Sequence, residues 1–135
     1  MSRDSNIALA ENLLAGMSRG IEPNELAKLF SRSLSFEIQG DEGVLPWIGR
    51  KTGRAAAAEF FRNLRALTEP VKFNVEDVLG SERRAVVVGD LASRLKANGR
   101  VFKTQFAIIL SITDGEIVRF QFLEDSFGLS RTVRD

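Results

Sequence analysis

The sequence of 135 residues contains no cysteine, no histidine and no tyrosine. These absences exclude disulfide bonds, thiol or imidazole catalysis, and the nitrogen and sulfur ligands of most structural metal sites. Neither sign of charge predominates, because 19 basic and 18 acidic side chains leave a formal net charge of +1. Such a balance favours neither nucleic acid nor an anionic membrane surface as a partner. We therefore expect no metal site, no cofactor and no nucleic-acid partner.

Long apolar runs are also absent. No stretch approaches the roughly 20 residues that span a bilayer, and the first six residues lack the apolar core of a signal peptide. The expectation is a cytoplasmic protein without a membrane partner. A chain of this length can bury about two-thirds of its unfolded surface in one core. With no repeat or linker in the sequence, we predict a single domain over residues 1–135.

The first half of the chain is predominantly helical in pattern. Asp4 or Ser5 is expected to cap a first helix that stops near Gly20, and Pro23 suits the first turn of a short second helix. Thr52 is the expected N-cap of a third helix. Its buried face should carry Phe60, Leu64 and Leu67.

The rest of the chain alternates between apolar and polar residues, which is typical of strands. Two dipeptides, Asn98-Gly99 and Asp114-Gly115, are strong signals for two-residue hairpin turns. Three helices followed by hairpin-connected strands predict an α+β fold, in which helices cover one face of a curved, mostly antiparallel sheet. The expected strands cover residues 34–39, 71–76, 84–97, 102–112 and 118–124.

Two neighbouring carboxylates are the candidate catalytic groups. Glu124 follows Phe120 and Phe122 on the same face of the last strand, so it either enters an apolar cavity as a general acid or base, or is solvated at the strand end. Asp125 is either an acid or base, or the cap of the turn that follows. Trp47, the only tryptophan, lies in a glycine-containing loop and forms either the rim of a ligand pocket or part of the core.

Several short motifs occur along the chain in a fixed order and spacing. They are Leu29-Phe30, Gly49, Gly53-Arg54 through Phe60-Phe61, and Asp114-Gly115-Glu116-Ile117-Val118-Arg119-Phe120. In this order they resemble the nuclear transport factor 2-like superfamily, and within it the SnoaL-like and ketosteroid isomerase-like proteins. The resemblance covers residues 6 to 129 approximately. It implies a cystatin-like, cone-shaped sheet whose open end admits small, mostly apolar molecules.

The resemblance also indicates which chemistry to expect. Ketosteroid isomerases carry their base and their two oxyanion donors at positions similar to Ile38, Leu14 and Ile108, all of which are apolar here. A steroid-type isomerase mechanism is therefore disfavoured, because it needs preorganised donors where charge develops. SnoaL-like polyketide cyclases keep an acid/base aspartate at the end of the last strand, at a position similar to Asp125.

Two functions remain open from the sequence. One is a cofactor-free isomerase, lyase, cyclase or hydrolase that acts on a small hydrophobic metabolite through Glu124 or Asp125, with Thr104 or Gln105 supplying a hydrogen bond. The other is a non-catalytic domain that binds an apolar ligand or dimerises. The expected pocket lining is Phe36, Ile38, Trp47, Phe60, Phe106, Phe120 and Phe122.

A homodimer is expected in either case. Ala107 and Ile109 alternate with Phe106 and Ile108, so they lie on the sheet face that points away from the helices. An apolar pair on that face requires cover, and the resemblance implies dimerisation through the same face.

Overall fold

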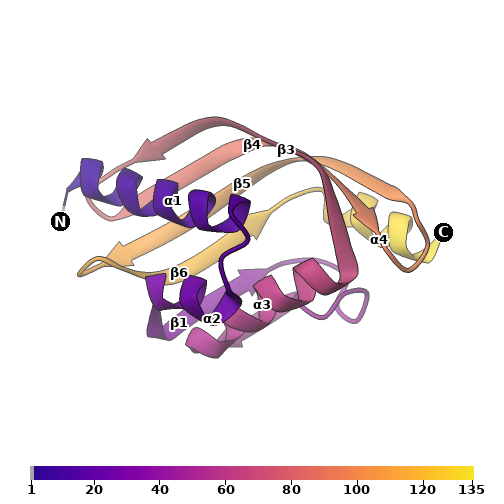
Figure 1. Ribbon diagram of the computed structural model, residues 1–135, viewed down its shortest axis with the longest axis horizontal. Helices are drawn as coiled ribbons and strands as arrows, with labels where there is room; N and C mark the ends of the chain where they lie inside the picture. Colours follow the sequence, from indigo (N-terminus) through magenta and orange to yellow (C-terminus); the bar gives the residue numbers. More distant parts are fainter. Residues whose placement is uncertain (1) are drawn as a thin grey trace.

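The computed structural model describes residues 2–135. Four α-helices, one short 3₁₀ helix and six strands make up this part of the chain (Figure 1). Among these residues, no helix is both long and apolar enough to cross a lipid bilayer. In chain order the elements are α1 (Arg3–Ser18), α2 (Pro23–Leu26), η1 (Ala27–Leu29), β1 (Phe30–Ile38), β2 (Gly49–Thr52), α3 (Arg54–Leu67), β3 (Thr68–Gly80), β4 (Arg84–Leu95), β5 (Val101–Thr113), β6 (Glu116–Leu123) and α4 (Ser126–Arg134).

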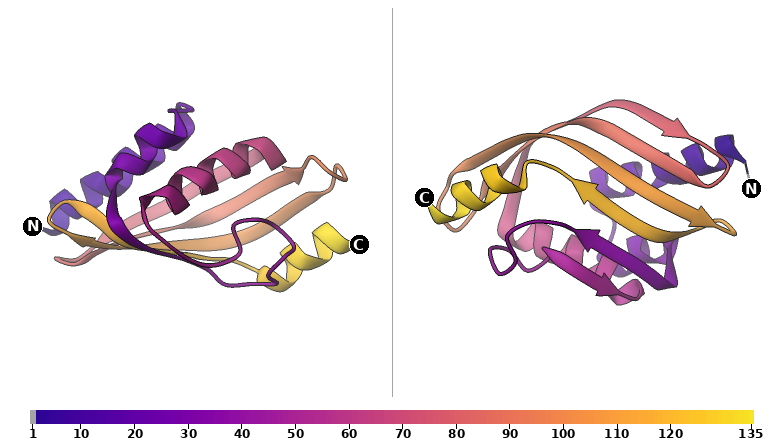
Figure 2. Two further views of the ribbon diagram at one scale, coloured as in Figure 1. Left: turned by 90° about the horizontal axis from the view of Figure 1, so that it is seen from below. Right: turned by 180° about the vertical axis from the view of Figure 1, so that it is seen from behind.

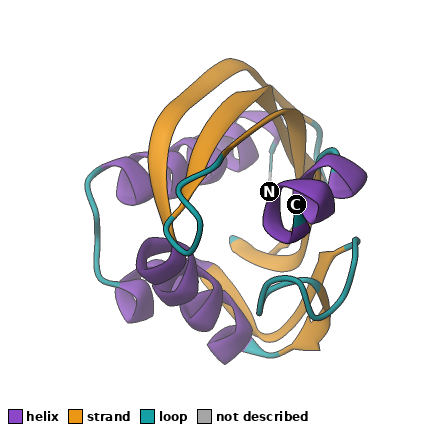
Figure 3. Cartoon of the chain, turned by 90° about the vertical axis from the view of Figure 1, so that its right-hand side faces the viewer, coloured by secondary structure: helices purple, strands orange, loops and turns teal. Residues whose placement is uncertain are grey.

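All six strands form one sheet in the order β2-β1-β6-β5-β4-β3. The pairing of β1 with β6 is parallel, with Phe36 opposite Phe120, and the other four pairings are antiparallel. The sheet is strongly curved but not closed. Helices α1 and α3 lie along its concave side, and α4 lies at the C-terminal edge (Figures 2 and 3). This is the predicted α+β architecture, with α4 as an additional helix.

The strand pattern of residues 102–112 is confirmed by β5, whose inward residues are buried while their neighbours are partly exposed. Antiparallel pairing of β5 with β6 places Leu110 opposite Phe120. The two-residue turn between them has φ angles of 52° at Asp114 and 76° at Gly115. Positive φ at both positions is what a type I′ hairpin turn requires, so the predicted hairpin is confirmed. The strand register shifts between Ser111 and Ile112, which brings Leu110 opposite Phe120.

Aromatic rings fill the core between β1, β6 and α3. Phe36 and Phe120 stack with ring centroids 5.2 Å apart, and Phe60 packs against both rings from the helix side. Phe30 packs against Phe120 and Phe61 further along. Burial of each such ring stabilises the fold by about 1.5–3 kcal/mol, so this cluster holds α3 firmly on the sheet.

The N-terminal helix begins earlier than predicted. Its N-cap is Ser2, and neither Asp4 nor Ser5 has that role, because the Ser2 hydroxyl accepts a hydrogen bond from the backbone of Ser5 at 3.1 Å in a capping box. The helical spacing of Ile7, Ala10, Leu14 and Met17 predicts the buried face of α1. In the structure that face is rotated, because Asn6 donates a hydrogen bond to the Ser81 carbonyl and Gly16 packs closely against Leu26. That face carries Asn6, Ala10, Leu13 and Gly16.

Five further details differ from the prediction. Thr52 ends strand β2, so α3 begins after Gly53, which has a φ of 94° that strains other residues. Residues 49–52, which were expected to belong to a glycine-containing loop, form strand β2, and β1 begins at Phe30, before the expected start at residue 34. The turn at Asn98-Gly99 belongs to a five-residue loop over residues 96–100, because β4 ends at Leu95. The last strand ends at Leu123, one residue before Glu124.

Candidate functional site

A cavity of about 420 Å³ lies between the concave face of the sheet and helices α1, α3 and α4. Its volume falls within the ~300–1,000 Å³ typical of small-molecule sites. Most of the wall is apolar, and each surrounding element contributes to it. The principal apolar contributions are Leu14 and Met17 of α1, Ile38 of β1, Phe60 of α3, Phe122 of β6 and Leu129 of α4.

Four of the seven aromatic or aliphatic residues predicted to line the pocket lie on the cavity wall: Ile38, Trp47, Phe60 and Phe122. The other three, Phe36, Phe106 and Phe120, are buried behind the wall. Phe106 illustrates their role, because its ring stacks on Phe122 with centroids 5.7 Å apart and thereby supports a wall residue. The aromatic pattern therefore contains a lining layer and a supporting layer.

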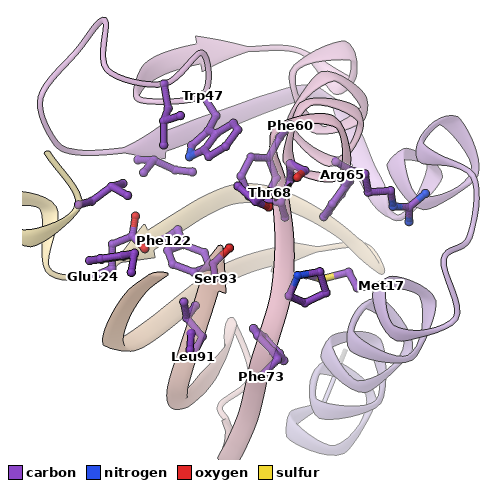
Figure 4. Close-up of a pocket in the computed structure, with 18 of the residues that line it drawn as sticks. Met17, Trp47, Phe60, Arg65, Thr68, Phe73, Leu91, Ser93, Phe122 and Glu124 are labelled. Atoms are coloured by element: carbon purple, nitrogen blue, oxygen red, sulfur yellow. Dashed lines mark hydrogen bonds between the residues drawn. The ribbon is translucent and has the colours of Figure 1, made fainter. Parts of the chain in front are cut away.

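Trp47 belongs to the wall and also to the core, so both interpretations of this residue hold together. Its side chain is only 5% exposed, and its ring meets Phe60 edge-on with centroids 5.9 Å apart (Figure 4). An edge-to-face contact between aromatic rings is a favourable geometry. The indole therefore has a fixed position in the cavity wall.

Glu124 is the acidic side chain of the wall, and it lies directly after β6 on the face that carries Phe122 (Figure 4). Burial, and secondarily the charge of Asp125, raises the pKa of Glu124 from its ordinary value of 4.5 to about 7. Among residues 2–135, no side chain or backbone group forms a hydrogen bond or salt bridge with this carboxyl group. It is therefore free to interact with a molecule in the cavity.

Asp125 has a different position and a different role. It is exposed, and its carboxylate accepts a hydrogen bond from the Gly128 backbone at 2.9 Å as the N-cap of α4. Its own backbone N–H donates to the Thr104 hydroxyl at 3.0 Å. Asp125 does not line the cavity, so the two carboxylates that the sequence could not separate point to different environments.

Helix α4 closes the Glu124 end of the cavity. Leu129 contributes the buried apolar contact, and Asp41 ties the helix to the loop before β2. The Asp41 carboxylate accepts hydrogen bonds from the Ser130 hydroxyl at 2.5 Å and from Arg134 at 3.0 Å. The Arg134 hydrogen bond, followed by that of Ser130, holds the pKa of Asp41 below its ordinary value. The carboxylate is therefore ionised at neutral pH, as this anchor requires.

Hydrogen-bonding groups in the cavity differ from those predicted. Thr104 donates to the backbone oxygen of Gln105 at 2.7 Å, and neither residue lines the cavity. Ser93 of β4 does line it, because in a strand every second residue lies on the same face and Ser93 shares the inner face with Leu91 and Leu95. Its hydroxyl faces the same space as Glu124 (Figure 4). The two-residue period of Leu91 and Leu95 in the sequence could therefore have predicted that Ser93 lines the cavity.

The fold and this site define the class of protein. A curved six-stranded α+β sheet with helices α1 and α3 on its concave side is the nuclear transport factor 2-like fold. The sequence model of the SnoaL-like domain matches residues 10–120, so the chain belongs to the SnoaL-like domain family. A comparison with curated proteins found no match.

Solved structures agree on the fold at low sequence identity. A nuclear transport factor 2-like protein from Burkholderia xenovorans is 21% identical, with a TM-score of 0.88 over 99% of each chain. A candidate polyketide cyclase from Xanthomonas campestris is 14% identical, with a TM-score of 0.76 over 98% of this chain and 99% of that chain. TerC co-crystallised with polyporic acid is 16% identical, with a TM-score of 0.78 over 97% and 99%.

Proposed function

We propose that the protein is a cofactor-independent acid/base enzyme that transfers a proton on a small, largely apolar molecule held in the cavity. The observation that carries this proposal is the Glu124 carboxyl at the end of an apolar cavity, without a protein partner and with a pKa of about 7. A general acid or base works best when its pKa lies near the working pH. Membership of the SnoaL-like family and neighbours that include a candidate polyketide cyclase support small-molecule chemistry.

The chemistry follows from the protonation state of Glu124. Near neutral pH a carboxyl group with this pKa is present in comparable amounts as acid and as carboxylate. The carboxylate can remove a proton from a carbon or hydroxyl group of the ligand and return it to another position, as an isomerase, lyase or cyclase requires. The Ser93 hydroxyl, which lines the same cavity, is a candidate donor for a ligand carbonyl oxygen. Trp47, Phe60 and Phe122 would hold the apolar body of the ligand.

The test needs a ligand and a matched pair of variants. Incubation of the protein with a cell extract, followed by gel filtration and mass spectrometry of the bound fraction, identifies molecules that the cavity retains. Proton transfer on these molecules is then measured by ¹H NMR in D₂O, as exchange of carbon-bound hydrogen or as formation of an isomer. Glu124→Gln preserves the shape of the side chain, so binding should persist while the rate falls by about 10²–10⁴-fold.

Asp125→Asn is the matched control, because asparagine is also a good N-cap and should retain α4. This variant should keep at least a tenth of the wild-type rate. Full turnover by Glu124→Gln would refute the acid/base assignment. Retention of ligand by the wild type without any proton transfer would instead favour the second function, a non-catalytic domain that binds an apolar ligand.

We also propose a homodimer formed through the outer face of the sheet. The strand registers place Val86 opposite Ile109, Val88 opposite Ala107, and Ala107 opposite Leu123 on this face. Leu79 of β3 lies opposite Val86, and it is 51% exposed in the monomer. A continuous apolar patch on four strands is typical of a surface that a partner covers. The patch consists of Leu79, Val86, Val88, Ala107, Ile109 and Leu123.

Sedimentation velocity at micromolar concentration tests this dimer. The wild type should sediment as a dimer, and Ile109→Asp should sediment as a folded monomer, because a charge at the centre of an apolar interface loses its solvation without gaining a partner. Circular dichroism confirms that the variant is folded. A monomeric wild type would refute the proposal without affecting the cavity.

A further inference from the structure

One cationic side chain at the rim of the cavity has no partner among the described residues. Arg65 lies in the last turn of α3, where it is exposed at the rim and contributes to the cavity lining. Among residues 2–135 its guanidinium forms no hydrogen bond and no salt bridge; only its backbone oxygen is used, accepting from Lys96 at 3.1 Å. Lys72, the other cation of the wall, is already paired with Asp90 at 2.7 Å. Among residues 2–135, the unpaired positive charge at the rim of the cavity is therefore that of Arg65.

Arg65 and Glu124 lie at opposite ends of the cavity. Figure 4 shows Arg65 on α3 and Met17 on the α1 side at one end, and Glu124 at the far side next to α4. The wall between them is formed largely by aromatic side chains, among them Phe60 and Phe122. A ligand that fills this space therefore meets a cation at one end, an apolar middle and an ionisable carboxyl group at the other end.

We infer that the ligand of this cavity is an amphipathic anion, with a carboxylate, sulfonate or similar group at Arg65 and its reacting end at Glu124. The inference rests on the proposal that the cavity takes a small apolar molecule. A guanidinium offers several donors in a planar fork that suits oxyanions. The reverse orientation would bring the anion against Glu124, where repulsion is strong because the apolar wall screens charge poorly.

Two fluorescent probes with the same aromatic body but different charge distinguish the contribution of charge to binding affinity from that of apolar contact. 1-Anilinonaphthalene-8-sulfonate carries a sulfonate that N-phenyl-1-naphthylamine lacks, and both fluoresce in apolar surroundings. Trp47 is the only tryptophan and lies in the cavity wall, so energy transfer from its indole is most efficient for probe molecules in the cavity. Dissociation constants from this signal are compared for the wild type, Arg65→Gln and Arg62→Gln.

Arg62 provides the matched control because it is an exposed arginine of the same helix that does not line the cavity. Its side chain donates to Asn24 at 3.5 Å, and its replacement changes the net charge equally. Arg65→Gln should weaken binding of the sulfonate probe by about tenfold and change binding of the neutral probe less than twofold, since a hydrogen bond to a charged group is lost. Arg62→Gln should change neither by more than twofold.

The orientation is tested with Glu124→Gln above pH 7.5, where the sulfonate probe should keep its wild-type affinity within threefold. A tenfold gain in that variant would place the anion beside Glu124 and overturn the inference. An equal effect of Arg65→Gln and Arg62→Gln would overturn it as well. In both cases, binding of the neutral probe in the cavity would leave the proposed function intact. Absence of energy transfer to either probe would count against both proposals.

Discussion

Replacement of Glu124 by glutamine should make the protein more stable at alkaline pH. The wild-type pKa rises from 4.5 to about 7 on folding, because burial disfavours the charged carboxylate. Between these two values the folded protein holds more protons than the unfolded chain, so the free energy of unfolding falls as the pH rises. At about 1.36 kcal/mol for each pH unit, the loss approaches about 3 kcal/mol above pH 7.

Glutamine has the shape of the protonated side chain and does not titrate, so Glu124→Gln removes this penalty. The variant should exceed the wild type by about 1 kcal/mol at pH 5 and by about 3 kcal/mol at pH 8.5. Urea denaturation followed by Trp47 fluorescence measures both free energies of unfolding. The comparison at each pH cancels the titration of every other group that the variant leaves unchanged.

Glu59→Gln is the matched control, because Glu59 is an exposed residue of α3. This variant should stay within about 0.5 kcal/mol of the wild type at both pH values, as is usual for surface substitutions. If Glu124→Gln gained less than about 0.5 kcal/mol between pH 5 and pH 8.5, the Glu124 carboxyl would be solvated. The basis of the proposed acid/base function would then be lost.

Three further substitutions test local features. Asp125→Ala should destabilise the protein by about 1 kcal/mol through the lost cap while Asp125→Asn does not, and both should lower the pKa of Glu124 in an NMR titration; an unchanged pKa would contradict the charge effect. Gly89→Ala should cost more than about 2 kcal/mol in urea denaturation, because an added Cβ would lie 1.9 Å from the backbone oxygen of Asn74; a neutral effect would contradict this close approach. Asn6→Ala should cost about 1–3 kcal/mol in thermal unfolding, because the buried amide donates at 2.9 Å to the Ser81 carbonyl; a smaller loss would show that water replaces it.

The parts of the fold with strong local signals were predictable from the sequence. Strand β5 alternates cleanly, and Asp114-Gly115 has the residues of a type I′ turn, so the β5–β6 hairpin followed directly. Strand β2 and helix α4 were missed for physical reasons. Residues 49–52 are mostly polar and gain their extended conformation from pairing with β1. Helix α4 contains Gly128, which disfavours helix, and is held by contacts from distant segments.

The candidate site was predictable only in part. The period of two along the last strand correctly placed Glu124 on the face of Phe122, although the strand itself ends earlier. Sequence alone could not decide between Glu124 and Asp125, because their separation depends on where the chain turns into α4. Arg65 carried no signal, since a charged residue in the last turn of a helix is ordinary. Its significance arises from the cavity that packing creates beside it.

The parallel pairing of β1 with β6 has a consequence for the order in which the molecule assembles. Phe36 and Phe120 are neighbours in the sheet but are separated by most of the chain. During synthesis from the N-terminus, β1 and β2 therefore have no sheet to join until the last strand has left the ribosome. The hairpins from β3 to β5 need only local closure and can form first. We expect closure of the long loop to be the slow step, and the carboxyl of Glu124 then enters its cavity as the last strand docks.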